Sequence, residues 1–103
     1  MLSETIAIVV QMTAKTGREE ELGHHLIRMI EPTTAEDGCI NYNLHRDSVD
    51  PATWVLYETW QSKKDLDKHM TSSHFLEFQS IQDEMLAKDM RVEILTPIKT
   101  TQR

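Results

Sequence analysis

Hydrophobic and polar residues alternate with the two-residue period of a β-strand in much of this chain. Four segments have this pattern or a β-branched character: 6–13 (IAIVVQMT), 39–46 (CINYNLHR), 53–60 (TWVLYETW) and 90–95 (MRVEIL). In the second segment, Ile40, Tyr42 and Leu44 are expected to share one face. The turn-rich residues 47–51 separate the second segment from the third, so these two are predicted to form a hairpin.

A helix is predicted between the first two strands. The sequence Lys15-Thr16-Gly17 breaks the first strand, and three acids at 19–21 suit the positive end of a helix dipole. An apolar stripe follows at helical spacing, formed by Leu22, Leu26, Met29 and Ile30. We expect Pro32 to end this helix, because proline removes a backbone hydrogen bond from a helix interior.

A second helical region follows the hairpin. Ser62 and Asp65 resemble a capping box at its start. Its inward face is expected to carry Leu66, His69 and Met70. Ser72-Ser73 interrupts the helix, and the later part has an apolar stripe of Phe75, Phe78, Ile81 and Met85. The element order is therefore β-α-β-β-α-β, which predicts a single α+β domain over residues 1–103. Its expected form is a ferredoxin-like antiparallel sheet with the helices on one face.

The strands are apolar on both faces, which is unusual for a sheet with helices on one face only. Ile8 and Val10 alternate with Ala7 and Val9 in the first strand, and Val55 and Tyr57 also lie on the second face. Burying each large apolar side chain contributes roughly 1.5–3 kcal/mol, so an uncovered second face would be costly. The pattern predicts a homodimer in which two open sheet faces stack.

Composition excludes several classes of partner. The net charge is −6 and there is no basic cluster, so neither nucleic acid nor an anionic membrane is expected. Cys39 is the single cysteine and has no partner for an internal disulfide, which fits the cytoplasm. The first ten residues lack a basic region and a span of about 20 apolar residues, so neither a signal peptide nor a membrane helix is predicted.

The candidate chemistry centres on the segment from Tyr57 to Phe75. His69 lies on the apolar face of its helix, where a neutral imidazole can act as general acid or base. Glu58 shares a strand face with Trp60, and a buried acid there must be paired or protonated. The structural alternative is a histidine that is hydrogen-bonded to a backbone carbonyl or to Glu58, with Trp60 as ordinary core.

Four further residues complete the set of candidates. On the second strand Tyr42 supplies a phenol and Asn41 an amide, but they point to opposite faces, so at most one enters a given pocket. His74 and Phe75 are candidates for substrate binding, and for His74 capping or packing is the alternative. No metal site is predicted, because His69 and His74 are five residues apart and no nearby carboxylate completes a set.

Three runs of sequence carry a family resemblance: GCINYNLHRD (38–47), WVLYETW (54–60) and DLDKHMTSSHF (65–75). In this order and spacing they resemble the antibiotic biosynthesis monooxygenase (ABM) domain family. The resemblance covers nearly the whole chain and implies a dimeric α/β barrel of ferredoxin-like protomers. Family members include monooxygenases that oxidise phenols or quinols with no metal or flavin, so the resemblance implies no cofactor. The axial histidine of the haem-degrading members falls near Gln79, which argues against haem.

The resemblance also implies roles for the candidate residues. His69 would be the base, Trp60 the ring contact, Tyr42 or Asn41 the donor to the developing oxyanion, and Glu58 would orient His69 or a water. The expected substrate is a small aromatic phenol or quinol. Two alternatives remain: an isomerase acting on a small phosphorylated signal molecule, and a non-catalytic ligand-binding or dimerisation module of the same fold.

Overall fold

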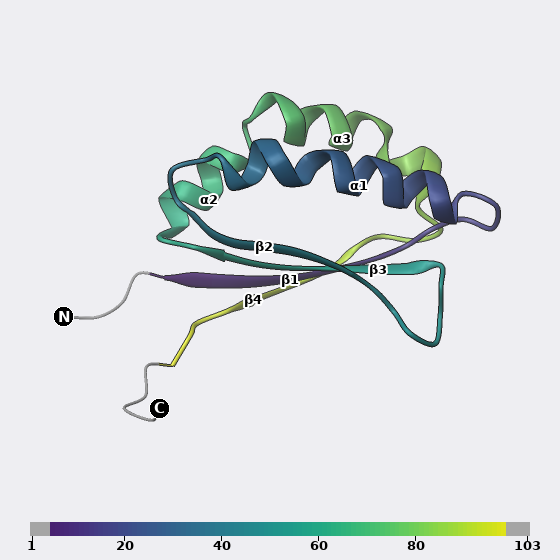
Figure 1. The fold of residues 1–103 in the computed structure, drawn as a ribbon, viewed down its shortest axis with the longest axis horizontal. Helices are drawn as coiled ribbons and strands as arrows, with labels where there is room; N and C mark the ends of the chain where they lie inside the picture. The colour runs from purple at the N-terminus through teal and green to yellow at the C-terminus, as the bar shows by residue number, and fades with distance from the viewer. Residues whose placement is uncertain (1–4, 99–103) are drawn as a thin grey trace.

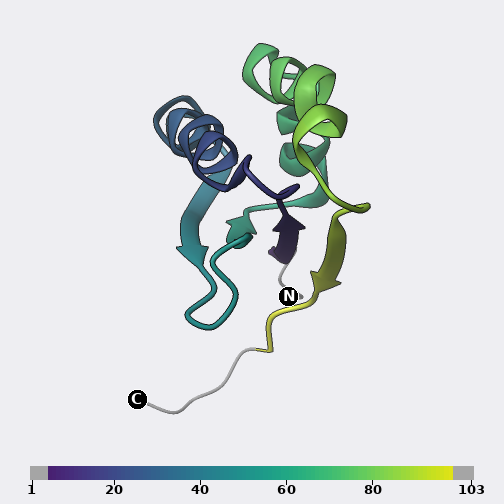
Figure 2. The ribbon, with the colours of Figure 1, turned by 90° about the vertical axis from the view of Figure 1, so that its right-hand side faces the viewer.

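The computed structural model describes residues 5–98 as two layers, a four-stranded antiparallel sheet and three helices that cover one of its faces (Figures 1 and 2). The elements are β1 (Ile6–Thr13), α1 (Glu19–Thr34), β2 (Cys39–Arg46), β3 (Thr53–Trp60), α2 (Lys63–His69), α3 (Ser73–Met85) and β4 (Arg91–Leu95). The strand order is β2-β3-β1-β4. The predicted α+β ferredoxin-like fold, with its second helical region divided, is confirmed.

Two predicted boundaries differ from the structure. α1 continues through Pro32 and ends at Thr34, so the expectation that Pro32 ends the helix was wrong. The proline lies in the last turn, where it removes one hydrogen bond and the helix is about to end. β4 begins at Arg91 rather than at residue 90.

The core lies between the sheet and the helices. In the β1–β3 pairing, Ile8 is opposite Glu58 and Val10 is opposite Leu56, and all four side chains are buried. The fully buried side chains with the largest volumes are Trp60, Met12, Leu22, Leu26, Met85 and Thr33. Glu58 is therefore a buried acid on the helix-covered face of the sheet, beside the hydrophobic core.

A bulge in β2 changes the predicted face of one residue. The register between β2 and β3 shifts between Cys39 and Asn41, so that Cys39 is opposite Trp60. Ile40 is the extra residue and is 48% exposed, so its expected place beside Tyr42 and Leu44 was wrong. Tyr42 remains on the helix-covered face and is 5% exposed.

The junction between α2 and α3 is built by two serine caps. Ser62 accepts a hydrogen bond from the backbone N–H of Asp65 at the start of α2, and Ser72 accepts one from the N–H of Phe75 at the start of α3. Met70 is the C-cap of α2 and is 40% exposed, so its predicted inward position was wrong. α2 therefore ends at His69, and Ser72 begins the next helix three residues later.

In the part of the chain that the structure describes, no helix is both long and apolar enough to cross a membrane.

Candidate functional site

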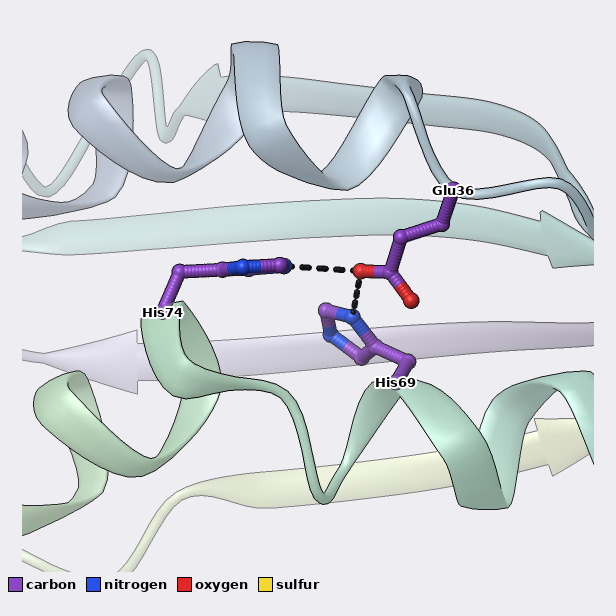
Figure 3. Close-up of side chains that lie close together, drawn as sticks. All are labelled: Glu36, His69 and His74. Carbon is purple, nitrogen blue, oxygen red and sulfur yellow. Dashed lines mark hydrogen bonds and ion pairs between the residues drawn. The ribbon is translucent and has the colours of Figure 1, made fainter.

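Three ionisable side chains from separate segments meet at one carboxylate oxygen (Figure 3). Nδ1 of His69, the last residue of α2, lies 2.7 Å from Oε2 of Glu36. Nε2 of His74, in the first turn of α3, lies 2.7 Å from the same oxygen. Glu36 follows α1 and is 33 residues from His69 in the sequence. The tertiary structure thus builds a cluster in which one carboxylate bridges two imidazoles.

The backbone around this cluster is held by hydrogen bonds. The N–H of Glu36 donates to the carbonyl of Thr33, and its carbonyl accepts from the N–H of Cys39. Ser72 donates to the carbonyl of His69 from both its backbone N–H, at 3.0 Å, and its hydroxyl, at 2.6 Å. Since Ser72 also caps α3, the separation between His69 and His74 is fixed by the turn between the helices.

His69 is enclosed by aromatic rings. Its ring centroid lies 4.8 Å from that of Trp60, 5.3 Å from that of Phe75 and 6.1 Å from that of Tyr42. The side chain is 3% exposed, and this burial lowers the pKa of His69, although the hydrogen bond to Glu36 opposes the shift. The neutral imidazole is therefore favoured. Because the carboxylate accepts a hydrogen bond, Nδ1 carries the proton and Nε2 has the lone pair.

Glu58 is paired with an indole and not with the imidazole. Oε1 of Glu58 accepts a hydrogen bond of 2.9 Å from Nε1 of Trp60. Burial raises the pKa of Glu58, against the effect of the Trp60 hydrogen bond. Burial also raises the pKa of the Tyr42 phenol, with a further contribution from the charge of Glu58. Both groups therefore favour their protonated forms more than they would in water.

A small cavity lies between the sheet and the helices beside these groups. Its volume is about 60 Å³, and its polar walls come from Tyr42, Glu58 and His69, with Gln82 at another side. Phe75 and other apolar side chains line the rest. Pockets for drug-sized ligands have volumes of about 300–1,000 Å³, so this cavity has room for a few waters but not for a polycyclic ring.

A larger groove is lined by residues of α1 and α3. Figure 2 shows these two helices on the same side of the sheet. The groove has a volume of about 420 Å³ and is bordered by His25, Arg28 and His74. Met29 and Phe78 line both this groove and the small cavity. The cavity and the groove therefore share two of their lining residues.

The predicted site residues are only partly brought together. Tyr42, Glu58, His69 and Phe75 line the cavity. Asn41 is exposed and lies opposite Thr59 on the other face of the sheet, so it does not reach the cavity. Trp60 has no exposed surface and packs on His69 without lining the cavity.

Glu36 was missed by sequence reasoning, which assigned the orienting role to Glu58. The sequence also offered no carboxylate to accompany His69 and His74, whereas the fold supplies Glu36. The signal in the sequence was weak: an acid in the turn before Gly38, far from both histidines.

Comparisons with known sequences add independent evidence. A family model described as "Antibiotic biosynthesis monooxygenase" matches residues 5–80. A Mycobacterium tuberculosis protein named "Putative monooxygenase Rv0793" is 32% identical over 97 residues, which are 94% of this chain and 95% of that protein. The Synechocystis protein "Uncharacterized protein sll1783" is 28% identical over 91 residues, which are 88% of this chain and 62% of that protein.

Solved structures show the same fold. The structure of Rv0793 from Mycobacterium tuberculosis has a TM-score of 0.89 at 30% identity, covering 95% of this chain and 99% of that one. The structure of PA3566 from Pseudomonas aeruginosa has a TM-score of 0.90 at 27% identity, covering 96% of this chain and 99% of that one. The whole two-layer arrangement is thus common to this chain and these relatives.

Proposed function

This chain belongs to the antibiotic biosynthesis monooxygenase family, and from that membership and the geometry of its site we propose that it is a monooxygenase acting on a small aromatic phenol or quinol. His69 is the general base, and the deprotonated substrate itself reduces oxygen, without metal or flavin. The substrate class rests on the roles that the family resemblance implies and on the aromatic walls around His69.

The observation that carries this proposal is the pairing of Glu36 with His69. A carboxylate on Nδ1 holds the imidazole in one tautomer and leaves the lone pair on Nε2, which is the arrangement of an oriented base. His69 lines the cavity, so its Nε2 is the nitrogen available to a group bound there. Glu36 acts through His69 and is a positioning residue.

The proposed reaction consumes one O₂ for each phenol. Nε2 of His69 takes the phenol proton, and the phenolate transfers one electron to O₂, giving a phenoxyl radical and superoxide. These combine at a ring carbon that carries hydrogen, forming a C–O bond. The O–O bond then breaks as the proton of that carbon passes to the distal oxygen, which leaves as hydroxide, and the proton on His69 converts the hydroxide to water. The products are one quinone and one water.

Tyr42 and Glu58 suit the remaining roles. Because burial raises the pKa of the Tyr42 phenol, its O–H stays available as a donor to developing negative charge on oxygen. Glu58 also lines the cavity, and its raised pKa favours a protonated carboxyl that donates a hydrogen bond. Entry of a ring requires Met29 and Phe78 to move, because the closed cavity is only about 60 Å³.

Oxygen uptake tests the proposal. Purified protein is screened with flat phenols and quinols, and turnover is compared in His69→Gln, which keeps much of the buried volume. Positioned general bases contribute about 10²–10⁴-fold, so kcat should fall by that factor. The control is His24→Gln, which removes an exposed imidazole from α1. Background uptake with every compound, or equal uptake in wild type and His69→Gln, would refute the assignment.

The small cavity favours a second candidate, a non-catalytic ligand-binding module. In that case the imidazole serves structure through its bond to Glu36. Substitution of His69 would then lower thermal stability, while phenols that bind would show no oxygen uptake in either protein.

We further propose that the chain forms a homodimer. The open sheet face has an apolar centre that includes Val9, Val55 and Tyr57, the last 41% exposed. On the other face, Val92 and Ile94 of the edge strand β4 are 49% and 63% exposed. A second copy of the chain that covers these surfaces removes their apolar side chains from water, which is favourable.

A further inference from the structure

The Glu36–His69–His74 cluster has a donor set that the proposed oxygenase chemistry does not require. A dyad of Glu36 and His69 suffices to orient the base, yet His74 makes an equally short contact of 2.7 Å with the same carboxylate oxygen. Two imidazole nitrogens and a carboxylate oxygen lie within 4.8 Å of one another. Two histidines with one carboxylate are a common set of ligands for zinc and for non-haem iron.

The carboxylate has no permanent positive partner among residues 5–98. Its ion pairs there are with His69 and His74 alone, and no lysine or arginine nitrogen of those residues lies within 4.0 Å. The Glu36 side chain is 20% exposed and that of His69 is 3% exposed. A half-buried carboxylate with no lysine or arginine beside it leaves room for a cation, and a divalent ion would supply that positive charge.

We propose that Glu36, His69 and His74 bind a divalent first-row transition-metal ion, with Zn²⁺ as the representative. The ligand atoms are Oε2 of Glu36, Nδ1 of His69 and Nε2 of His74. In a tetrahedral zinc site the metal–ligand distances are about 2.0–2.2 Å, so ligand atoms lie about 3.3 Å apart. To reach that spacing the two 2.7 Å contacts lengthen and the two imidazole nitrogens, which lie within 4.8 Å of each other, settle about 3.3 Å apart, through rotation of the three side chains.

The backbone around the site is held in place, and the site is open on one side. The turn at Ser72 fixes the backbone of the two histidines relative to each other, and backbone hydrogen bonds hold the segment of Glu36 between α1 and β2. His74 borders the groove between α1 and α3, and its side chain is 19% exposed. Solvent therefore has access to a fourth coordination position. Imidazole ligands select transition metals over Mg²⁺ and Ca²⁺, which prefer oxygen.

Metal binding has a consequence for His69. When Nδ1 gives its lone pair to the metal, the proton of the neutral ring moves to Nε2. Nε2, the atom proposed as the base, is then a hydrogen-bond donor and can no longer accept a proton. The metal-bound protein should therefore lack the proposed base. Metal binding itself does not depend on whether the protein is an oxygenase.

Direct titration tests this site. Chelator-treated protein is titrated with Zn²⁺ in a calorimeter and with Co²⁺ in a visible spectrometer, where coordination by nitrogen in a low-symmetry site gives intense d–d bands. We expect one ion per chain and no binding of Mg²⁺. Glu36→Gln and His74→Gln should each weaken binding by more than about 100-fold, since loss of even an outer-sphere partner costs about 10–100-fold.

His24→Gln is the matched control. His24 lies on the exposed surface of α1, does not border the groove and belongs to no group of three ligands in the described residues. Its substitution should leave affinity unchanged. Circular dichroism and thermal unfolding confirm that each variant is folded, and NMR of the wild-type histidine rings identifies the ligands without any substitution. Absence of stoichiometric binding, or equal affinity in Glu36→Gln, would overturn the proposal and leave the cluster a hydrogen-bonded one.

Discussion

Replacement of the buried acid Glu58 by glutamine should stabilise this protein at neutral pH. Glu58 is 5% exposed, and burial raises its pKa above the ordinary value of 4.5. A group whose pKa is higher in the folded state binds more protons there than in the unfolded state. Wild-type stability is therefore fully present below pH 4.5 and falls as pH rises through the raised pKa. Glu58→Gln has no such proton to lose.

The size of the effect is bounded by linkage. Between the unfolded pKa and the raised folded pKa, the folded protein holds a proton that the unfolded chain has lost, which costs about 1.4 kcal/mol for each pH unit. At pH 7 that cost is at most about 3.4 kcal/mol, given the ordinary pKa of 4.5. The amide oxygen still accepts from Nε1 of Trp60, and only in the fraction of wild-type protein whose Glu58 is ionised does this exchange a charged acceptor for a neutral one that is weaker by about 1 kcal/mol. We expect a net gain of about 1–3 kcal/mol.

Guanidinium denaturation of Glu58→Gln and wild type at pH 4 and pH 7 measures this gain. The two proteins should have similar free energies of unfolding at pH 4 and differ at pH 7. Glu77→Gln, on the exposed surface of α3, controls for loss of a negative charge from an acidic protein. If the Glu58→Gln protein is no more stable than wild type at pH 7, the reasoning is refuted. Interactions in the folded state would then stabilise the Glu58 carboxylate as well as water does.

Three other outcomes follow from the packing, the titration and the open face of the sheet. Gly23→Ala should lower the free energy of unfolding by about 1–2 kcal/mol in denaturant: the new Cβ overlaps the Trp54 ring, and overpacking outweighs a gain in helix propensity of about 1 kcal/mol. A stabilised variant would contradict this. Burial, with smaller contributions from nearby acids, raises the pKa of Cys39 to about 11, so its alkylation rate should rise about tenfold per unit between pH 7 and 10. An alkylation rate that stops rising below pH 9 would show that the pKa of Cys39 is not raised. Val9→Glu should shift light-scattering mass from dimer to monomer, whereas Val49→Glu, in a loop position that is 90% exposed, should not. A monomeric wild type would remove the basis for the dimer.

Local sequence was sufficient for most of the elements. The bounds of β1, β2 and β3 match the predicted segments because alternation and β-branching mark a strand without reference to its neighbours. The break between α2 and α3 was predicted for a similar reason, since Ser72 caps a helix through contacts within three residues. The inward position of His69 also followed from helical spacing.

Long-range packing decided what the local pattern did not contain. Ile40 is outside the core because the pairing with β3 shifts at that point, and a strand does not carry its partner's register in its own sequence. His69 is paired with Glu36 and not with Glu58, although only Glu58 shares the segment that carries His69.

The sequence by itself therefore determined the elements, their order and most of their buried positions, since these depend on contacts a few residues apart, and it placed Ile40 and Met70 wrongly. Only the tertiary structure decided which charged groups meet. The turn before Gly38 packs against Asp65 of α2 so closely that even a Cβ at residue 38 would overlap that side chain. This approach brings Glu36 to His69 and His74 across more than 30 residues of chain. Such a contact depends on how the layers stack, and no periodicity within one element encodes it.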